Sequence, residues 1–252
     1  MRRTAVVTGV SRRIGIGAAI SRRLAADGFD LLLHSWAPHD AEQPWGADEG
    51  WTDEFTRELR ETGARVEHVA ADLADPRAPA ELVRRAVEAY GHLDVVVANH
   101  ARGVGQALED LTATELDLTY AVNTRATLLL VQQFAAQHDG RPGGRIVLMT
   151  SGQHRGPMPG ELPYIASKGA LHQLTGSLSA HLAPRGITVN TVDPGATDTG
   201  YASDAVLRAV LAEEPQGRWG EPDDAARLVA WLAGEESRWV TGQVIVSSGG
   251  GP

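Results

Sequence analysis

Seven short apolar runs, separated by longer stretches with helical periodicity, are the feature that most constrains how this chain can fold. Short apolar runs bounded by glycine or polar turns are typical of strands buried on both faces of a parallel sheet. The runs cover residues 5–7, 31–33, 66–69, 95–98, 146–149, 187–192 and 244–246. The helical patterns cover about 17–27, 52–63, 77–90, 112–138, 163–182 and 222–233.

This alternation of strands and helices predicts right-handed βαβ units. The fold class is therefore α/β, with a Rossmann-type, doubly wound parallel sheet of about seven strands and helices on both faces. No linker, repeat or low-complexity segment divides the chain, so we expect residues 1–252 to form one domain.

Composition limits the partners of such a domain. The formal net charge of −9, with no cluster of basic residues, argues against nucleic acid or an anionic membrane surface. Cysteine is absent, which excludes disulfides and cysteine-based metal sites, and we expect no metal. The sequence holds no run of about 18 apolar residues, so no membrane span is expected. The first apolar run is too short for a signal peptide, and we expect a cytoplasmic protein.

A glycine-rich loop joins the first predicted strand to the first predicted helix. It reads Thr8-Gly9-Val10-Ser11-Arg12-Arg13-Ile14-Gly15-Ile16-Gly17. In a strand–turn–helix context, free backbone N–H groups and the positive end of the helix dipole can hold a pyrophosphate. Glycines are also common in ordinary turns between strands and helices, so the loop alone is a weak indicator of cofactor binding.

A serine, a tyrosine and a lysine are spaced so that a loop and a helix can bring them together. Ser151 follows the predicted strand 146–149, while Tyr164 and Lys168 are four residues apart and share one helix face. Reduction of a carbonyl needs a proton donor for the developing alkoxide and a second donor that steadies that oxygen. Tyrosine is a weak acid, so we expect a nearby Lys168 ammonium to lower the pKa of Tyr164.

With these motifs in this order, the chain resembles the classical short-chain dehydrogenase/reductase family over essentially its whole length. Within that family the general pattern is similar to 3-oxoacyl-thioester reductases. The TGxxxGxG loop of the family corresponds to residues 8–17, although the loop here is two residues longer. Its NNAG turn corresponds to residues 98–101, where only the second Asn, Asn99, is kept. Asn123 matches the helix Asn, and residues 193–200 match the PG turn.

The resemblance implies a nicotinamide-dependent oxidoreductase with catalytic residues Asn123, Ser151, Tyr164 and Lys168. Tyr164 would be the acid/base, and Ser151 would bond the substrate oxygen with it. Asn123 would hold a water that connects Lys168 to solvent. The cofactor would contact Gly9, Ser11, Arg12, Arg13, Gly15, Ile16, Gly17, His34, Asp72, Leu73, Asn99, Ala101, Tyr164, Lys168, Pro194, Gly195 and Thr197.

The end of the second predicted strand bears on the choice between NAD(H) and NADP(H). An acidic residue there would bond the ribose hydroxyls and repel a 2′-phosphate. The strand instead ends at His34-Ser35-Trp36, with no carboxylate before Asp40. Arg12 and Arg13 can pair with a phosphate, so we expect NADP(H) to be preferred. The alternative is that both arginines face solvent or pair with acidic residues of the insertion.

Two segments without a clear pattern are expected to lie beside the site. Residues 34–50 are either a surface loop near the cofactor or a solvated insertion that caps the sheet edge. Residues 197–217 are the expected substrate loop. The expected substrate contacts are Gln153, His154, Met158 and Tyr201, and His100 could also bond a polar substrate. Four arginines could form a local docking patch for an acidic carrier protein: Arg102, Arg125, Arg141 and Arg155.

The leading hypothesis is reduction of a small-molecule ketone to an alcohol, or the reverse reaction. The same tyrosine could serve reduction of a C=C or C=N bond, or a dehydratase or epimerase that keeps its cofactor bound. A non-catalytic NADP(H)-sensing protein is disfavoured because all four catalytic positions are filled. The family resemblance further implies a homodimer or homotetramer built on the helical patterns 112–138 and 163–182.

Overall fold

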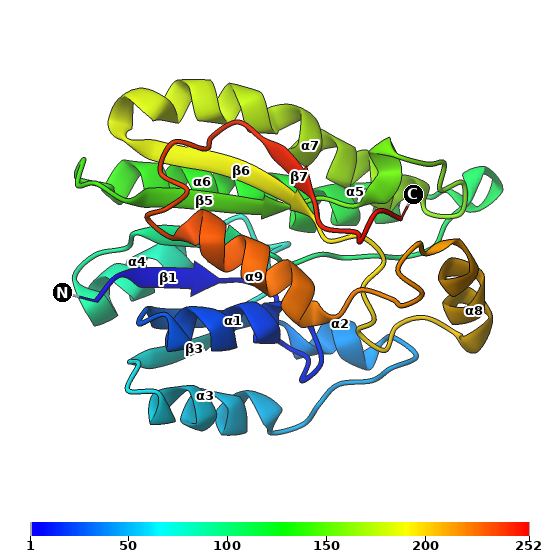
Figure 1. Ribbon diagram of the computed structural model, residues 1–252, viewed down its shortest axis with the longest axis horizontal. Helices are drawn as coiled ribbons and strands as arrows, with labels where there is room; N and C mark the ends of the chain where they lie inside the picture. Colours follow the sequence, from blue (N-terminus) through cyan, green and yellow to red (C-terminus); the bar gives the residue numbers. More distant parts are fainter. Residues whose placement is uncertain (1, 252) are drawn as a thin grey trace.

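Seven strands form one fully parallel sheet in the order β3-β2-β1-β4-β5-β6-β7 (Figure 1). They are β1 (Thr4–Val7), β2 (Asp30–Ser35), β3 (Val66–Ala70), β4 (Val95–Ala98), β5 (Gly144–Met149), β6 (Ile187–Asp193) and β7 (Val244–Val246). The computed structural model describes residues 2–251. All seven predicted strands lie in this sheet, and the predicted doubly wound α/β fold is confirmed.

Helices cover both faces of the sheet. One face carries α1 (Ile16–Ala26), α3 (Trp51–Glu61) and α9 (Pro222–Ala233). The other carries α4 (Ala78–Tyr90), α6 (Ala126–Gln137) and α7 (Leu162–Leu182). Shorter elements are α5 (Ala113–Tyr120) and the turns η1 (Leu108–Asp110), η3 (Gly152–His154) and η4 (Ala183–Arg185). Two further helices, α2 (Ala37–Ala41) and α8 (Asp204–Glu213), lie in segments expected to be loops, at the end of the molecule towards which the strands point (Figure 1).

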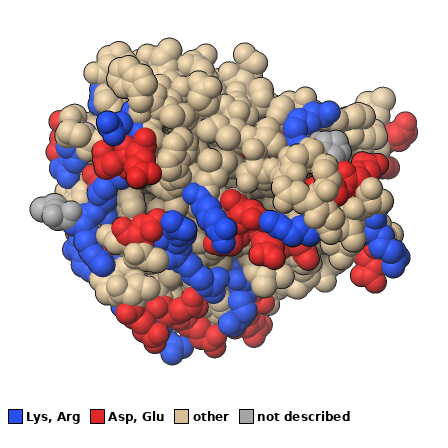
Figure 2. All heavy atoms as spheres, viewed as in Figure 1, with Lys and Arg blue, Asp and Glu red and all other residues tan. Residues whose placement is uncertain are grey.

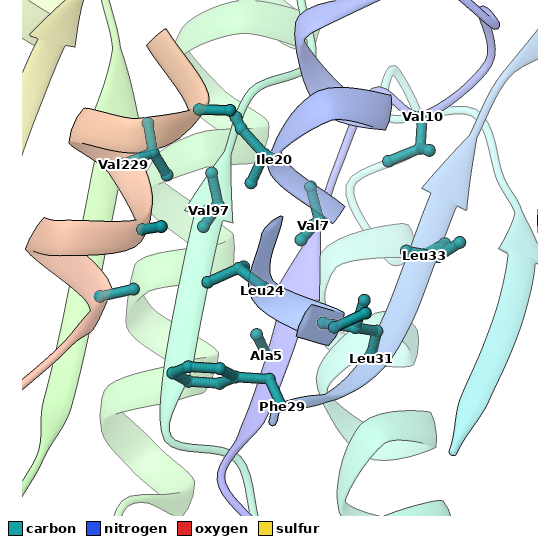
Figure 3. Close-up of a cluster of buried hydrophobic side chains, with 14 of the residues drawn as sticks. Ala5, Val7, Val10, Ile20, Leu24, Phe29, Leu31, Leu33, Val97 and Val229 are labelled. Carbon is teal, nitrogen blue, oxygen red and sulfur yellow. The ribbon is translucent and has the colours of Figure 1, made fainter. Parts of the chain in front are cut away.

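The core is divided into two halves by the alternation of side chains along each strand. Ala5 and Val7 of β1 face the α1/α3/α9 layer, whereas Val6 between them faces the α4/α6/α7 layer. Successive side chains of a strand point to opposite faces, so a strand covered on both sides must be apolar throughout. Figure 3 shows Ile20 and Leu24 of α1 packed against the sheet beside Val97.

The helix predicted over residues 112–138 is interrupted. After α5 the chain makes a π-helical turn, Ala121–Arg125, before continuing as α6. A π turn accommodates one extra residue within a helix and is frequent at functional sites. This turn contains Asn123, so the interruption sets where that side chain points.

Charges of both signs alternate on the face of Figure 2 that includes α1 and α3, while the area over α7 and β6 is largely uncharged. No basic stripe is visible on this face. None of the helices within residues 2–251 is both long enough and apolar enough to span a membrane.

Candidate active site

A cleft of about 980 Å³ opens beyond the carboxyl ends of the strands. It lies where the strand order reverses, between β1 and β4, which is where doubly wound sheets bind ligands. Most residues assigned to the cofactor from the sequence line it: Gly9, Ser11, Arg12, Gly15, Ile16, Gly17, His34, Asp72, Leu73, Asn99, Ala101, Tyr164, Pro194, Gly195 and Thr197. Arg13 and Lys168 are not among its lining residues.

The glycine loop brings the N-terminus of α1 close to the end of β1. A Cβ on Gly17 would lie 2.4 Å from the Gly9 carbonyl oxygen, so only glycine fits there. Gly9 has φ +74°, and a Cβ there would lie 2.7 Å from the His100 Cα. The first turn of α1 has no side-chain cap and no acidic residue. Its N–H groups and dipole therefore suit an anionic group such as a cofactor phosphate.

Asn99 and His100 connect the end of β4 to the end of β1 through side-chain hydrogen bonds. The Asn99 side-chain amide donates to the carbonyls of Thr8 (3.0 Å) and Gly9 (3.1 Å). His100 Nδ1 lies 2.7 Å from the Thr8 hydroxyl, and Nε2 lies 3.0 Å from the Val122 carbonyl in the π turn. Burial lowers the pKa of His100 to about 3, so the ring is neutral. His100 lines the cleft, but both of its ring nitrogens already have protein partners, and a bond from it to a substrate stays a prediction.

His34 connects β2 to its neighbours in a similar way. Its Nδ1 accepts from the Gly9 N–H at 3.3 Å, and its Nε2 lies 2.9 Å from the Ala71 carbonyl. These contacts require a neutral ring with the proton on Nε2, and burial lowers the pKa of His34 to about 4. The end of β2 therefore brings no charge of either sign to the cleft.

The two loop arginines point in different directions. Arg12 lines the cleft, donates to the Thr199 carbonyl at 2.6 Å and stacks over the Trp45 ring at 4.7 Å. Arg13 is exposed and forms an ion pair with Glu54 at 3.1 Å, while its backbone N–H donates to Asp48. The structure thus brings Arg12 but not Arg13 to the cleft, because the acidic residues of the insertion and α3 hold Arg13 outside.

The insertion at residues 34–50 forms one wall of the cleft and is not a solvated cap. Trp36, His39 and Trp45 line the cleft, and α2 places Asp40 in a buried position. The Trp45 indole donates to Asp40 Oδ1 at 3.0 Å, which fixes the ring over Arg12. An aromatic wall of this kind suits the planar base of a nucleotide.

Ser151 and Tyr164 line the cleft, and Lys168 lies directly behind them. Ser151 follows β5, and Tyr164 lies in the first turn of α7. Lys168 is only 2% exposed; its Nζ donates to the Met149 carbonyl at 2.9 Å and lies 5.8 Å from the centre of the Tyr164 ring. The predicted trio is therefore brought together by the end of β5 and one face of α7.

The expected lowering of the pKa of Tyr164 is not found. Burial raises the pKa of Tyr164 to about 12, and the Ser151 hydroxyl offsets only part of that rise. Burial also lowers the pKa of Lys168 to about 8. The expected lowering fails because burial of the phenol outweighs it, and the charge of Glu161 also favours neutral Tyr164.

Asn123 fixes the π turn against the loop that follows β4. Its side-chain NH₂ donates to the Arg102 carbonyl (2.9 Å) and to the Ser167 hydroxyl (2.8 Å). Its side-chain oxygen accepts from the Arg102 N–H at 2.6 Å. Asn123 therefore positions the wall of the cleft next to α7, and the proton relay expected from the resemblance remains a prediction.

Only some of the residues that the sequence analysis expected to contact the substrate line the cleft. Met158 and Tyr201 line the cleft as expected. Gln153 and His154 do not: Gln153 donates to the Thr150 hydroxyl at 3.0 Å, and the His154 ring packs on His172 at 4.7 Å. The cleft is also lined by residues not predicted for the substrate: Val104, Leu118, Val122 and Glu161. The only signal for Glu161 was its place three residues before Tyr164.

Arg155 joins the loop after Ser151 to the turn that starts at Asp193. Its Nε donates to the fully buried Asp193 carboxylate at 2.9 Å, and its Nη1 donates to the Gly251 carbonyl at 2.8 Å. The other Asp193 oxygen accepts from the Gly195 N–H at 3.0 Å. The arginines expected as a docking patch are thus engaged separately: Arg102 with Glu115, Arg141 with Asp139, and Arg125 with the Ala74 carbonyl.

Replacing Arg155 by Met is expected to lower the free energy of unfolding by about 3 kcal/mol, because it leaves a buried carboxylate without its partner. Urea unfolding at pH 7 measures the change. The control is Arg141→Met, which removes an exposed pair with Asp139 and is expected to change stability by less than about 1 kcal/mol. Equal effects of the two substitutions would contradict the structural role of Arg155.

No group of three or more potential metal ligands occurs among the side chains of residues 2–251.

The comparisons with known proteins match the whole domain. Residues 9–251 match a family model described as enoyl-(acyl carrier protein) reductase. An uncharacterized oxidoreductase, YjdA of Bacillus subtilis, is 41% identical over 248 residues, covering 98% of this chain and 95% of that protein.

Two solved structures agree with the fold. A short-chain dehydrogenase from Burkholderia cenocepacia in complex with NADP superposes with a TM-score of 0.89 at 38% identity, covering 99% of this chain and 97% of that one. The reductase LugOII, described as catalysing keto-reduction at C1 during lugdunomycin biosynthesis, gives a TM-score of 0.85 at 38% identity, covering 98% and 96%.

Proposed function

The chain belongs to the short-chain dehydrogenase/reductase family of oxidoreductases, and from that premise we propose that it is an NADP(H)-dependent enzyme that reduces a ketone to an alcohol or catalyses the reverse. The observation that carries the proposal is the position of Ser151 and Tyr164 on one cleft wall, with Lys168 buried behind them. The keto-reduction named for LugOII also supports it.

In the proposed reaction, Tyr164 donates its proton to the carbonyl oxygen, and Ser151 donates a hydrogen bond to the same atom. When bound, the reduced nicotinamide supplies the hydride to the carbonyl carbon. A pKa of about 12 keeps Tyr164 protonated at neutral pH, as a proton donor must be. The buried Lys168 ammonium favours the tyrosinate left after the transfer.

The cradle for the cofactor would be formed by the glycine loop and the turn after β6. The uncapped N-terminus of α1 would bond the pyrophosphate. Gly195, which has φ +67°, and Thr197 would face the nicotinamide. Asp72 and the walls from the insertion would surround the adenine end.

Arg12 supports the preference for NADP(H), because it is the loop arginine that lines the cleft. Arg12→Ala is expected to raise the Kd of NADPH by about 10- to 100-fold, since a hydrogen bond between charged groups contributes about 1.5–3 kcal/mol. The Kd of NADH should change by less than about threefold. Fluorescence titration of the purified protein measures both constants.

Arg13→Ala is the matched control, because Arg13 is the neighbouring residue and pairs with Glu54 outside the cleft. It should leave both dissociation constants close to those of the wild type. If Arg12→Ala weakened NADPH and NADH by the same factor, or if the wild type bound NADH as tightly as NADPH, the proposed preference would be wrong.

The reaction itself is tested by following the loss of NADPH absorbance with a panel of ketones, an enone and a cyclic imine. Turnover of a ketone with formation of the alcohol supports the proposal. The enone is included because the matched family model describes an enoyl reductase. Reduction of the C=C bond alone would replace carbonyl reduction by enoyl reduction, and tight NADPH binding without turnover of any probe would contradict both.

A further inference from the structure

The substrate side of the cleft contains an isolated carboxylate. Its walls include the apolar side chains of Val104, Leu118, Val122 and Met158, and Glu161 lies among them. The other carboxylates of the cleft belong to the insertion and to the segment after β3, on the adenine side. Within residues 2–251, the Glu161 side chain has neither an ion-pair partner nor a hydrogen-bond donor, in contrast to Glu115, which Arg102 holds at 2.8 Å.

The backbone fixes the position of Glu161. Its N–H donates to the Met158 carbonyl at 3.2 Å, and the next residue, Leu162, donates to the Gln106 carbonyl at 3.0 Å. Residues 106 and 161 form an isolated parallel bridge. Glu161 is therefore held between the loop after Ser151 and the loop after β4, immediately before the helix that carries Tyr164.

The charge of Glu161 acts on the groups that surround the substrate. Glu161 lines the cleft together with Tyr164 and Tyr201, and its charge contributes to the raised pKa of both tyrosines. Glu161 is exposed where it lines the cleft, and the protein around it desolvates its carboxylate enough to raise its pKa. A carboxylate with no cation beside it can be paired by a cation that the ligand carries.

We propose that Glu161 is a specificity-determining residue that selects ketones bearing a cationic or hydrogen-bond-donating group and disfavours ketones bearing a carboxylate. The inference rests on the proposed ketone reduction and deepens it by naming the substrate class. A cation within a few ångströms of Glu161 is attracted and an anion is repelled. At the effective dielectric of a protein surface, each effect corresponds to about tenfold in kcat/KM.

Three acetophenones that differ only beyond a methylene group at the para position test this proposal: 4-(aminomethyl)acetophenone, 4-methylacetophenone and 4-acetylphenylacetate. The methylene insulates the carbonyl from the charged group, so the reactivity of the ketone stays similar. With NADPH at pH 7, the wild type should show the highest kcat/KM for the ammonium probe and the lowest for the carboxylate probe. The expected ratio between these two is about 100.

Glu161→Gln keeps the shape of the side chain and removes its charge. It should reduce the ratio between the ammonium and carboxylate probes to below about ten, mainly through KM. Glu161→Lys should invert the order. Glu236→Gln, which removes an exposed carboxylate elsewhere, is the control and should keep the wild-type ratio. A ratio that stays at its wild-type value in Glu161→Gln would overturn the proposal.

Binding of the same probes separates this inference from the proposed function. The dissociation constants of the three probes from the protein saturated with NADPH can be measured by calorimetry, whether or not turnover occurs. If no ketone is reduced but the ammonium probe binds more tightly than the carboxylate probe in a manner that depends on Glu161, the proposed reaction fails and the role of Glu161 stands. Equal binding of all three probes by the wild type and by Glu161→Gln overturns the role of Glu161.

Discussion

Tyr164→Phe is expected to lower kcat for ketone reduction by about 10³-fold or more, while the Kd of NADPH changes by less than about threefold. The substitution removes one hydroxyl group and leaves the ring that lines the cleft. Ser151, the other member of the trio that lines the cleft, is far less acidic than a tyrosine and serves as the second donor. Steady-state kinetics and fluorescence titration of the same preparations measure the two effects.

Tyr120→Phe is the matched control. Tyr120 lies at the end of α5, is 52% exposed and does not line the cleft. The kcat of the Tyr120→Phe variant should stay within about twofold of the wild-type value. If Tyr164→Phe kept more than about a tenth of the wild-type kcat with a substrate for which chemistry is rate-limiting, Tyr164 would not be the proton donor.

Lys168→Met is expected to inactivate the enzyme by about 10²- to 10³-fold and, at the same time, to stabilise the cofactor-free protein. Burial lowers the pKa of Lys168 from 10.5 to about 8, so holding the charge in the folded state costs about 3 kcal/mol at pH 7. Methionine removes that cost but leaves the Met149 carbonyl without its donor, which costs about 1–2 kcal/mol. The net gain at pH 7 is about 1–2 kcal/mol.

The pH dependence tests the sign of this effect. Below about pH 8, both the folded and the unfolded wild type carry the charge, and the folded state bears the full cost. Between about 8 and 10.5, the folded state releases the proton before the unfolded state does, so the free energy of unfolding of the wild type rises with pH. Urea unfolding should therefore show a stability gain for Lys168→Met at pH 7 that shrinks or reverses near pH 10. A variant less stable than the wild type at pH 7 would contradict the burial cost.

The strands could be predicted from the sequence because they are covered on both faces. Ala5, Val6 and Val7 are all fully buried, and such a run is visible without knowledge of its neighbours. Helix α8 was not predicted because none of its residues is buried, so it carries no apolar stripe facing a core. The π turn at Asn123 was also missed, since a single extra residue hardly alters the apolar pattern of a long helix.

The sequence indicated which residues form the site, but it did not indicate which way their side chains point. The spacing of Ser151, Tyr164 and Lys168 placed them together, because a strand end and a helix face leave little choice. Arg12 and Arg13 are adjacent, and only the tertiary position of Glu54 decides which of them faces outward. The pKa of Tyr164 depends on how deeply its hydroxyl is buried and on nearby charges such as Glu161, neither of which the sequence specifies.

The buried Lys168 is also the only lysine in the sequence, since every other basic side chain with a fixed positive charge is arginine. Among the side chains, Lys168 is therefore the single target for amine-directed chemistry. Reductive methylation with ¹³C-formaldehyde would give one side-chain NMR signal, and its chemical shift would follow the proton on that single nitrogen as cofactor and substrate are added. The composition of this chain thus provides a spectroscopic probe at the one lysine amine, which lies behind Ser151 and Tyr164.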